Sequence, residues 1–70
     1  MKKYRIQITV IRRWFEDTYR LTNVYVTAAG SMEEALGKAS RYADHQLIEE
    51  NADTIKHISV TEIGDAVNEG

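Results

Sequence analysis

Two histidines, His45 and His57, are the only imidazoles of this 70-residue chain, which contains no cysteine. Zinc sites combine His and Cys ligands at short spacing, whereas these two histidines fall on different predicted elements. Ser59 follows His57 closely, but nucleophilic catalysis also needs a third group that orients the base. No such group is evident, so the sequence predicts no metal centre, no cofactor and no Ser-His active site.

Two pairs of adjacent carboxylates, Glu33-Glu34 and Glu49-Glu50, are the next candidates for chemistry. Adjacent positions on a helix splay about 100° apart, so neither pair converges on one substrate atom. Glu33 and Glu34 follow Ser31 in the first turn of a predicted helix, where acidic side chains favour the helix dipole. The same acidity would repel a phosphate, and we expect neither a nucleotide site nor an enzyme.

The most informative segment combines aromatic and basic residues, Arg12-Arg13-Trp14-Phe15, followed by Tyr19. Tryptophan, tyrosine and arginine are enriched at interface hot spots. Alternatively, Trp14 and Tyr19 extend the small core. A third reading is nucleic-acid binding, in which bases stack on these rings, but the chain has a net charge of -2 and no broad basic stripe. We predict contacts to a partner protein first at the aromatic and basic group, and second at acidic outward residues of the helix: Arg12, Arg13, Trp14, Phe15 and Tyr19, then Glu33, Glu34 and Asp44.

Length and composition limit what surrounds these residues. Seventy residues make one domain with a thin core, and small domains without disulfides often depend on a partner. Six of the nine Lys and Arg residues precede Asn23, whereas nine of the eleven Asp and Glu residues follow it. No apolar run is long enough for a signal peptide or a membrane span. We therefore expect a cytoplasmic protein that does not enter a membrane, with a homodimer as a further option.

The elements that position the aromatic segment are two strands. Residues 3–12 alternate apolar and polar side chains, which is typical of a half-buried strand, and residues 19–28 form a second β-rich run. The parity of the second run shifts, so we predict a β-bulge near Thr22-Asn23 that turns Val24 and Val26 to the core. Glu16-Asp17-Thr18 is the predicted turn of the hairpin.

A helix and a third strand complete the predicted domain. Ser31 and Glu34 make a capping box, the helical wheel turns Glu50 inward, and the helix should end near residue 49. Residues 55–63 form the third strand, with His57, Ser59 and Thr61 on the open side. A right-handed crossover gives strand order 2-1-3, so we expect an α+β domain over residues 1–64 and a flexible tail over 65–70. The predicted apolar stripe of the helix is Met32, Ala35, Leu36, Ala39, Ala43 and Leu47.

Two segments are notable, Val26-Thr27-Ala28-Ala29-Gly30-Ser31-Met32-Glu33-Glu34-Ala35-Leu36 and the β-rich ending Ile58-Ser59-Val60-Thr61-Glu62-Ile63. Through them, roughly residues 24–63 resemble very small bacteriophage proteins. The nearest such family is the T7-type gene 2 product, an inhibitor of the host bacterial RNA polymerase. The resemblance implies a three-stranded sheet with one helix, no catalysis, and action by occupying a polymerase surface. The family's last strand carries arginines that bind the polymerase, but the matching positions here are Glu62 and Gly64, so no contacting residue is carried over.

Taken together, these features predict a non-enzymatic phage-type protein that binds and modulates a bacterial protein machine, with RNA polymerase as one such machine. One alternative is an anti-CRISPR or anti-restriction decoy that presents an acidic helix face. A second alternative is a small nucleic-acid-binding domain.

Overall fold

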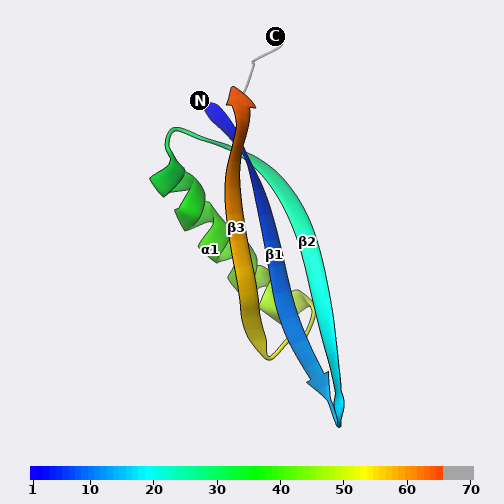
Figure 1. The fold of residues 1–70 in the computed structure, drawn as a ribbon. Helices are drawn as coiled ribbons and strands as arrows, with labels where there is room; N and C mark the ends of the chain where they lie inside the picture. The colour runs from blue at the N-terminus through cyan, green and yellow to red at the C-terminus, as the bar shows by residue number, and fades with distance from the viewer. Residues whose placement is uncertain (66–70) are drawn as a thin grey trace.

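The computed structural model describes residues 1–65 and consists of an antiparallel sheet with one helix. The elements are β1 (Lys2–Trp14), β2 (Asp17–Ala29), α1 (Met32–Glu49) and β3 (Thr54–Asp65). β1 is the central strand, the sheet order is β2-β1-β3, and α1 lies across one face (Figure 1). The predicted α+β class, β-β-α-β element order and sheet topology are confirmed.

The core lies between alternate residues of β1 and the small residues of α1. Tyr4, Ile6, Ile8 and Val10 are buried, as their period of two requires when one face of a strand is covered. Burial of each large apolar side chain stabilises the fold by about 1.5–3 kcal/mol. The helix contributes side chains that let it approach the sheet closely, namely Ala35, Ala39 and Ala43.

The buried stripe of α1 differs from the prediction at both margins. Met32 and Leu36 were expected in the stripe, but they are 41% and 51% exposed. Met32 lies in the first turn, which stands to the side of the sheet (Figure 1), and Leu36 lies at the edge of the buried face. Gln46, which a hydrophobicity pattern does not select, is only 1% exposed and belongs to the stripe.

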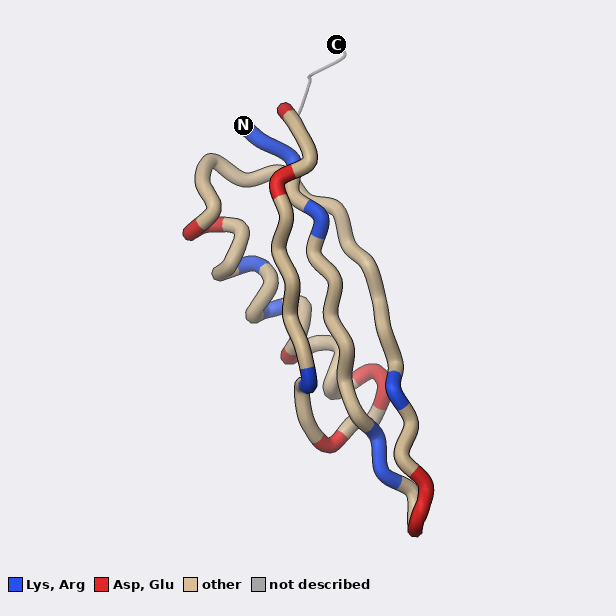
Figure 2. The backbone as a smooth tube through the Cα atoms, in the orientation of Figure 1, with Lys and Arg blue, Asp and Glu red and all other residues tan. Residues whose placement is uncertain are grey.

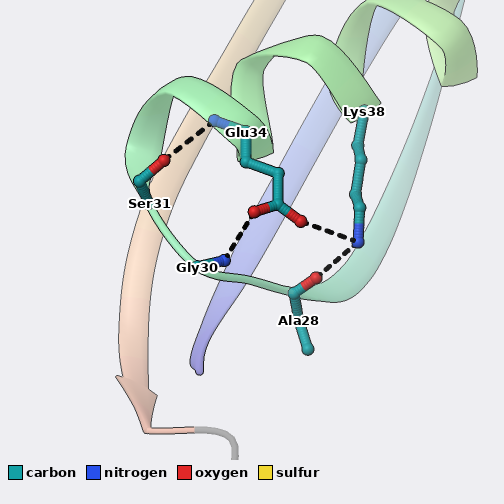
Figure 3. Close-up of polar contacts among 5 residues, drawn as sticks. All are labelled: Ala28, Gly30, Ser31, Glu34 and Lys38. Atoms are coloured by element: carbon teal, nitrogen blue, oxygen red, sulfur yellow. Dashed lines mark hydrogen bonds and ion pairs between the residues drawn. The ribbon is translucent and has the colours of Figure 1, made fainter.

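Local capping fixes both ends of α1. The Ser31 hydroxyl accepts a hydrogen bond from the Glu34 amide, and a Glu34 carboxylate oxygen accepts one from the Gly30 amide (Figure 3). The predicted capping box is therefore confirmed. The helix ends at Glu49, as predicted, and Asn51 adopts a left-handed φ of 50°. The Ala52 amide then donates a hydrogen bond to the Leu47 carbonyl, so the helix ends in a Schellman motif.

The predicted bulge in the second strand is wrong. β1 and β2 pair in one unbroken register from Lys2↔Ala29 to Trp14↔Asp17, because a two-residue hairpin loop fixes the register of both strands. Val24 and Val26 consequently lie on the sheet face opposite α1, here called the open face, and are 50% and 59% exposed. The turn is Phe15-Glu16 rather than the predicted Glu16-Asp17-Thr18, since β2 begins at Asp17.

The irregularities of the sheet lie instead between β1 and β3. The register shifts between Lys3 and Tyr4 and between Thr9 and Val10. The predicted open side of the third strand is confirmed by register, because its residues pair with open-face positions of β1. β3 continues to Asp65, one residue into the predicted tail, and the rest of that tail lies outside the described residues. The open-side residues of β3 are His57, Ser59 and Thr61.

Candidate functional site

The β1–β2 hairpin extends beyond the end of the helix, and the predicted aromatic and basic residues lie on this extension. The molecule measures 49 × 19 × 17 Å, because the two strands of the hairpin have 13 residues each. Figure 1 shows the β1–β2 turn at one end of the molecule, clear of α1 and β3. We call residues 12–19 the hairpin tip.

The turn at the hairpin tip holds a bulky residue in an unfavourable backbone conformation. Phe15 has a φ of 57°, in the left-handed region that glycine and asparagine occupy readily and that a large side chain avoids. Its side chain is 89% exposed. Neither backbone preference nor burial therefore explains a phenylalanine at this position, and residues held under such strain cluster at functional sites.

The aromatic rings at the tip are arranged around one another. Trp14 is 55% exposed and its ring centroid lies 5.1 Å from that of Phe15, at an interplanar angle of 82°. The Arg12 guanidinium carbon lies 5.8 Å from the Trp14 ring centroid, within the range of a cation–π contact. The sequence left open whether Trp14 and Tyr19 belong to the core, and at 55% and 48% exposure they do not.

A hollow of about 340 Å³ lies between the hairpin tip and the end of the helix. By strand parity, Arg12, Trp14 and Tyr19 lie on the helix side of the hairpin and Arg13 on the open face. Tyr19 pairs with Arg12 across the two strands. Glu50 was not predicted as a site residue, although the helical wheel already turned it inward. The hollow is lined by Arg12, Trp14, Tyr19, Leu21 and Glu50.

A loop residue supports Arg13 from the other side of β1. The Asp53 carboxylate accepts a hydrogen bond from the Arg13 amide at 2.6 Å, and the Asp53 amide donates to the Ile11 carbonyl at 2.8 Å. Through these two bonds, Asp53 extends the contact between β1 and the β3 side of the sheet by one residue before β3 begins at Thr54. The base of the hairpin tip is thus hydrogen-bonded to the loop that precedes β3, while Arg13 remains exposed.

The acidic helix residues do not join the hairpin tip. Glu33 and Glu34 lie in the first turn of α1, at the end of the molecule opposite the tip (Figure 2). The Glu34 carboxylate is already engaged at the N-terminal end of α1. It accepts a hydrogen bond from the Gly30 amide and lies 3.8 Å from the Lys38 ammonium (Figure 3). Glu33 and Asp44 are exposed. The eight predicted contact residues therefore divide between two parts of the fold, five at the hairpin tip and three along α1.

The open face has a charge pattern of its own. Its paired strand positions carry Lys3, Arg5, Arg13 and Arg20 and no carboxylate within residues 1–65. Tyr25 lies on the other, helix side of the sheet, where its ring stacks on that of Tyr42 with ring centroids 4.8 Å apart. The face thus combines positive charge with hydroxyl groups and valines, and its paired positions hold the imidazole of His57 but no Phe, Tyr or Trp ring.

Residues that could hold a metal ion do not converge in the described part of the chain. Among residues 1–65, no three His, Asp or Glu side chains group together. The His45 imidazole lies 3.3 Å from Glu49 on the helix surface, and His57 pairs with Thr9 on the open face. No helix among these residues is long and apolar enough to cross a membrane.

Comparisons with protein-family models, curated proteins and solved structures gave no significant match.

Proposed function

We propose that this protein is a non-enzymatic binding protein that contacts a partner protein through its hairpin tip. The observation that carries the proposal is Phe15, which is 89% exposed and has a φ of 57°. Burial of one such side chain in a partner contributes about 1.5–3 kcal/mol. This gain would offset the cost of placing a phenylalanine in an unfavourable backbone conformation. Trp14 and Arg12 lie beside it and add the residue types that dominate interface energetics.

The shape of the tip favours insertion into a concave surface of a partner. Trp14 and Phe15 project at the end of a two-stranded extension, and the edge-to-face contact holds one ring against the other. The hollow between Tyr19 and Glu50 can receive a side chain of the partner in return. A partner groove lined by apolar residues and rimmed by carboxylates fits both the rings and the neighbouring arginines.

We further propose that the partner is a bacterial protein machine and that the protein is of the phage-encoded, host-modulating type that acts in the host cytoplasm. The support is the resemblance of residues 24–63 to small phage inhibitors of RNA polymerase. The three-stranded sheet with one helix is compatible with that resemblance. RNA polymerase is therefore the first machine to test.

The test is capture of partners from a bacterial lysate, with purified RNA polymerase assayed separately. Tagged wild type is compared with Trp14→Ala, Phe15→Asn and Arg13→Glu. Leu36→Ala is the matched control, because Leu36 is an apolar residue whose exposure (51%) is close to that of Trp14 (55%) and which lies toward the opposite end of the molecule. We expect the three tip variants to lose the captured protein and the control to retain it. Equal capture by all variants would exclude the hairpin tip.

The open face favours nucleic acid as a second candidate ligand, because four basic residues lie there without a carboxylate at the paired positions. Such contacts neutralise phosphates and weaken steeply with salt. Arg5→Glu with Arg20→Glu should then abolish a gel shift with DNA or RNA at low salt, whereas Phe15→Asn should not. Absence of any shift at low salt eliminates this candidate. An acidic decoy receives no comparable support, since Glu34 is engaged within the helix end.

A further inference from the structure

The outer edge of β2 carries backbone groups that the sheet does not use. β2 pairs with β1 on one side only, and in an antiparallel pair alternate residues direct their N–H and C=O groups to the neighbour. The Ala28 carbonyl accepts a hydrogen bond from the Lys38 ammonium at 2.6 Å, so it points away from β1. Parity then places the backbone groups of four further residues on the same outer edge: Arg20, Thr22, Val24 and Val26.

The two edges of the sheet differ in how they are protected against pairing. Natural sheets block exposed edges with bulges, lysine, proline or short strands. β3 follows this rule, because its register shifts twice and it contains Lys56 and Gly64. β2 has 13 residues, pairs with β1 without a bulge, and contains no lysine, proline or glycine; its only charged residues are Asp17 at its start and Arg20. Lys38 covers only the Ala28 carbonyl of this edge.

We propose that the outer edge of β2 pairs antiparallel with β2 of a second copy of this chain, about a two-fold axis at Asn23. Asn23 is the midpoint of Asp17–Ala29, so this register gives the longest overlap. It places Thr22 opposite Val24 of the second copy and brings the side-chain amides of the two Asn23 residues together, where each can donate to the other. The result is one continuous six-stranded sheet with both helices on the same face.

The charges of the strand fit a second copy. In this register the only charged open-face residue of β2, Arg20, lies opposite Val26 of the other copy, so no like charges meet. Asp17 lies opposite Ala29 of the other copy, next to the carbonyl where Lys38 is bound. Asp17 and Lys38 share the helix side of the sheet, and the two-fold axis forms this acid–base pair twice. Val24 and Val26, now 50% and 59% exposed, gain neighbours across the axis.

The dimer would change how the hairpin tip acts. Phe15 lies eight residues from the axis at Asn23, which at about 3.3 Å per residue puts the two tips roughly 50 Å apart, at opposite ends of the sheet. A dimer could therefore engage two partner sites at once and gain avidity without new contacts. The pairing itself involves no tip residue, so it can be tested whether or not the proposed binding function holds.

The first experiment measures molecular mass and amide hydrogen exchange of the full chain over a range of concentrations. We expect a monomer–dimer equilibrium in sedimentation. The amides of Arg20, Thr22, Val24 and Val26 should exchange quickly in dilute solution and become protected as the dimer forms. The amides of Leu21, Asn23 and Tyr25 face β1 and should be protected throughout, so they provide the internal control. A monomer at every concentration, or new protection along β3 instead, overturns the proposal.

The second experiment uses Val24→Pro, because proline removes an N–H that points to the outer edge and that β1 does not need. We expect a folded monomer, whereas the control Val24→Thr should still dimerise. If Val24→Pro does not fold, a pair of charge variants decides. Thr22→Lys with Val24→Lys opposes like charges across the axis and should weaken association roughly tenfold or more, whereas Thr22→Glu with Val24→Lys should restore it. A dimer that responds to none of these changes, or edge protection that needs another protein, contradicts the proposal.

Discussion

Replacing Phe15 by asparagine should stabilise the protein while removing its proposed contact. Phe15 occupies the left-handed region, with a φ of 57°, and asparagine tolerates this region because its short side chain bonds the local backbone. The phenylalanine ring is 89% exposed, so the substitution gives up little buried apolar surface. The change therefore separates the stability of the fold from the binding of a partner.

The magnitude follows from two opposing effects. An ordinary L-residue in the left-handed region costs about 1–2 kcal/mol. The edge-to-face contact between Phe15 and Trp14, with centroids 5.1 Å apart, is worth about 0.5 kcal/mol at an exposed site. The free energy of unfolding should thus rise by roughly 0.5–1.5 kcal/mol, and Tm by about 2–12 °C for a domain of this size.

Urea and thermal unfolding of wild type, Phe15→Asn and Phe15→Ala provide the assay. Phe15→Ala is the matched control, because it removes the same ring but keeps a side chain that disfavours a positive φ. We expect the order Asn above wild type, with Ala at or below wild type. If Asn and Ala are both less stable than wild type by the same amount, the ring itself stabilises the hairpin, and strain at Phe15 is no argument for function.

Other substitutions test the core, the helix and its surroundings. Gln46 is buried and donates to the Ile8 and Leu21 carbonyls at 3.3 and 3.2 Å. In urea unfolding, Gln46→Ala should therefore cost about 3 kcal/mol, whereas Gln46→Met should cost about 1 kcal/mol or less because methionine keeps the volume. Equal losses for the two variants would contradict the prediction that lost volume costs more than lost hydrogen bonds. Gly37→Ala should add about 1 kcal/mol, because the added Cβ meets no atom within 4 Å apart from its chain neighbours and the nearby helix backbone. A loss of helicity by circular dichroism would count against it. The hydrogen bond to Glu62 raises the pKa of Lys2 above its usual 10.5. The stabilising effect of Glu62 over Glu62→Gln should therefore be present below that pH and disappear as the pH rises through the raised pKa, as followed by urea midpoints at neutral and alkaline pH.

The fold could be predicted because its signals are local. The alternation of Tyr4, Ile6, Ile8 and Val10 specifies a strand with one buried face, and Ser31 with Glu34 specifies the start of the helix. Connection lengths and the handedness of the crossover then leave one compact order for three strands. The bulge in β2 was predicted wrongly because apolar parity was taken as evidence of burial. The two-residue turn at Phe15-Glu16 fixes the register instead, and Val24 and Val26 are left exposed.

The candidate site was only partly accessible to sequence reasoning. Residue types alone selected Trp14, Phe15 and Arg12, because these types recur at interfaces. The left-handed conformation of Phe15 had no sequence signal. The helical wheel turned Glu50 inward, but it did not indicate that Glu50 would line the hollow beside Tyr19. Both depend on where a turn closes and where the helix ends relative to the hairpin.

The sequence by itself thus determined the class of the fold, the ends of the helix and the candidate aromatic residues, because each is encoded by neighbours along the chain. Only the tertiary structure decided which residues are left over once the sheet and helix have packed. Burial is set by pairing partners far apart in sequence, such as Val10↔Leu21 and Ile8↔Ile58, and by a helix that covers one face and one length of the sheet. That uneven coverage leaves the hairpin tip projecting and, within residues 1–65, the outer edge of β2 without a neighbouring strand.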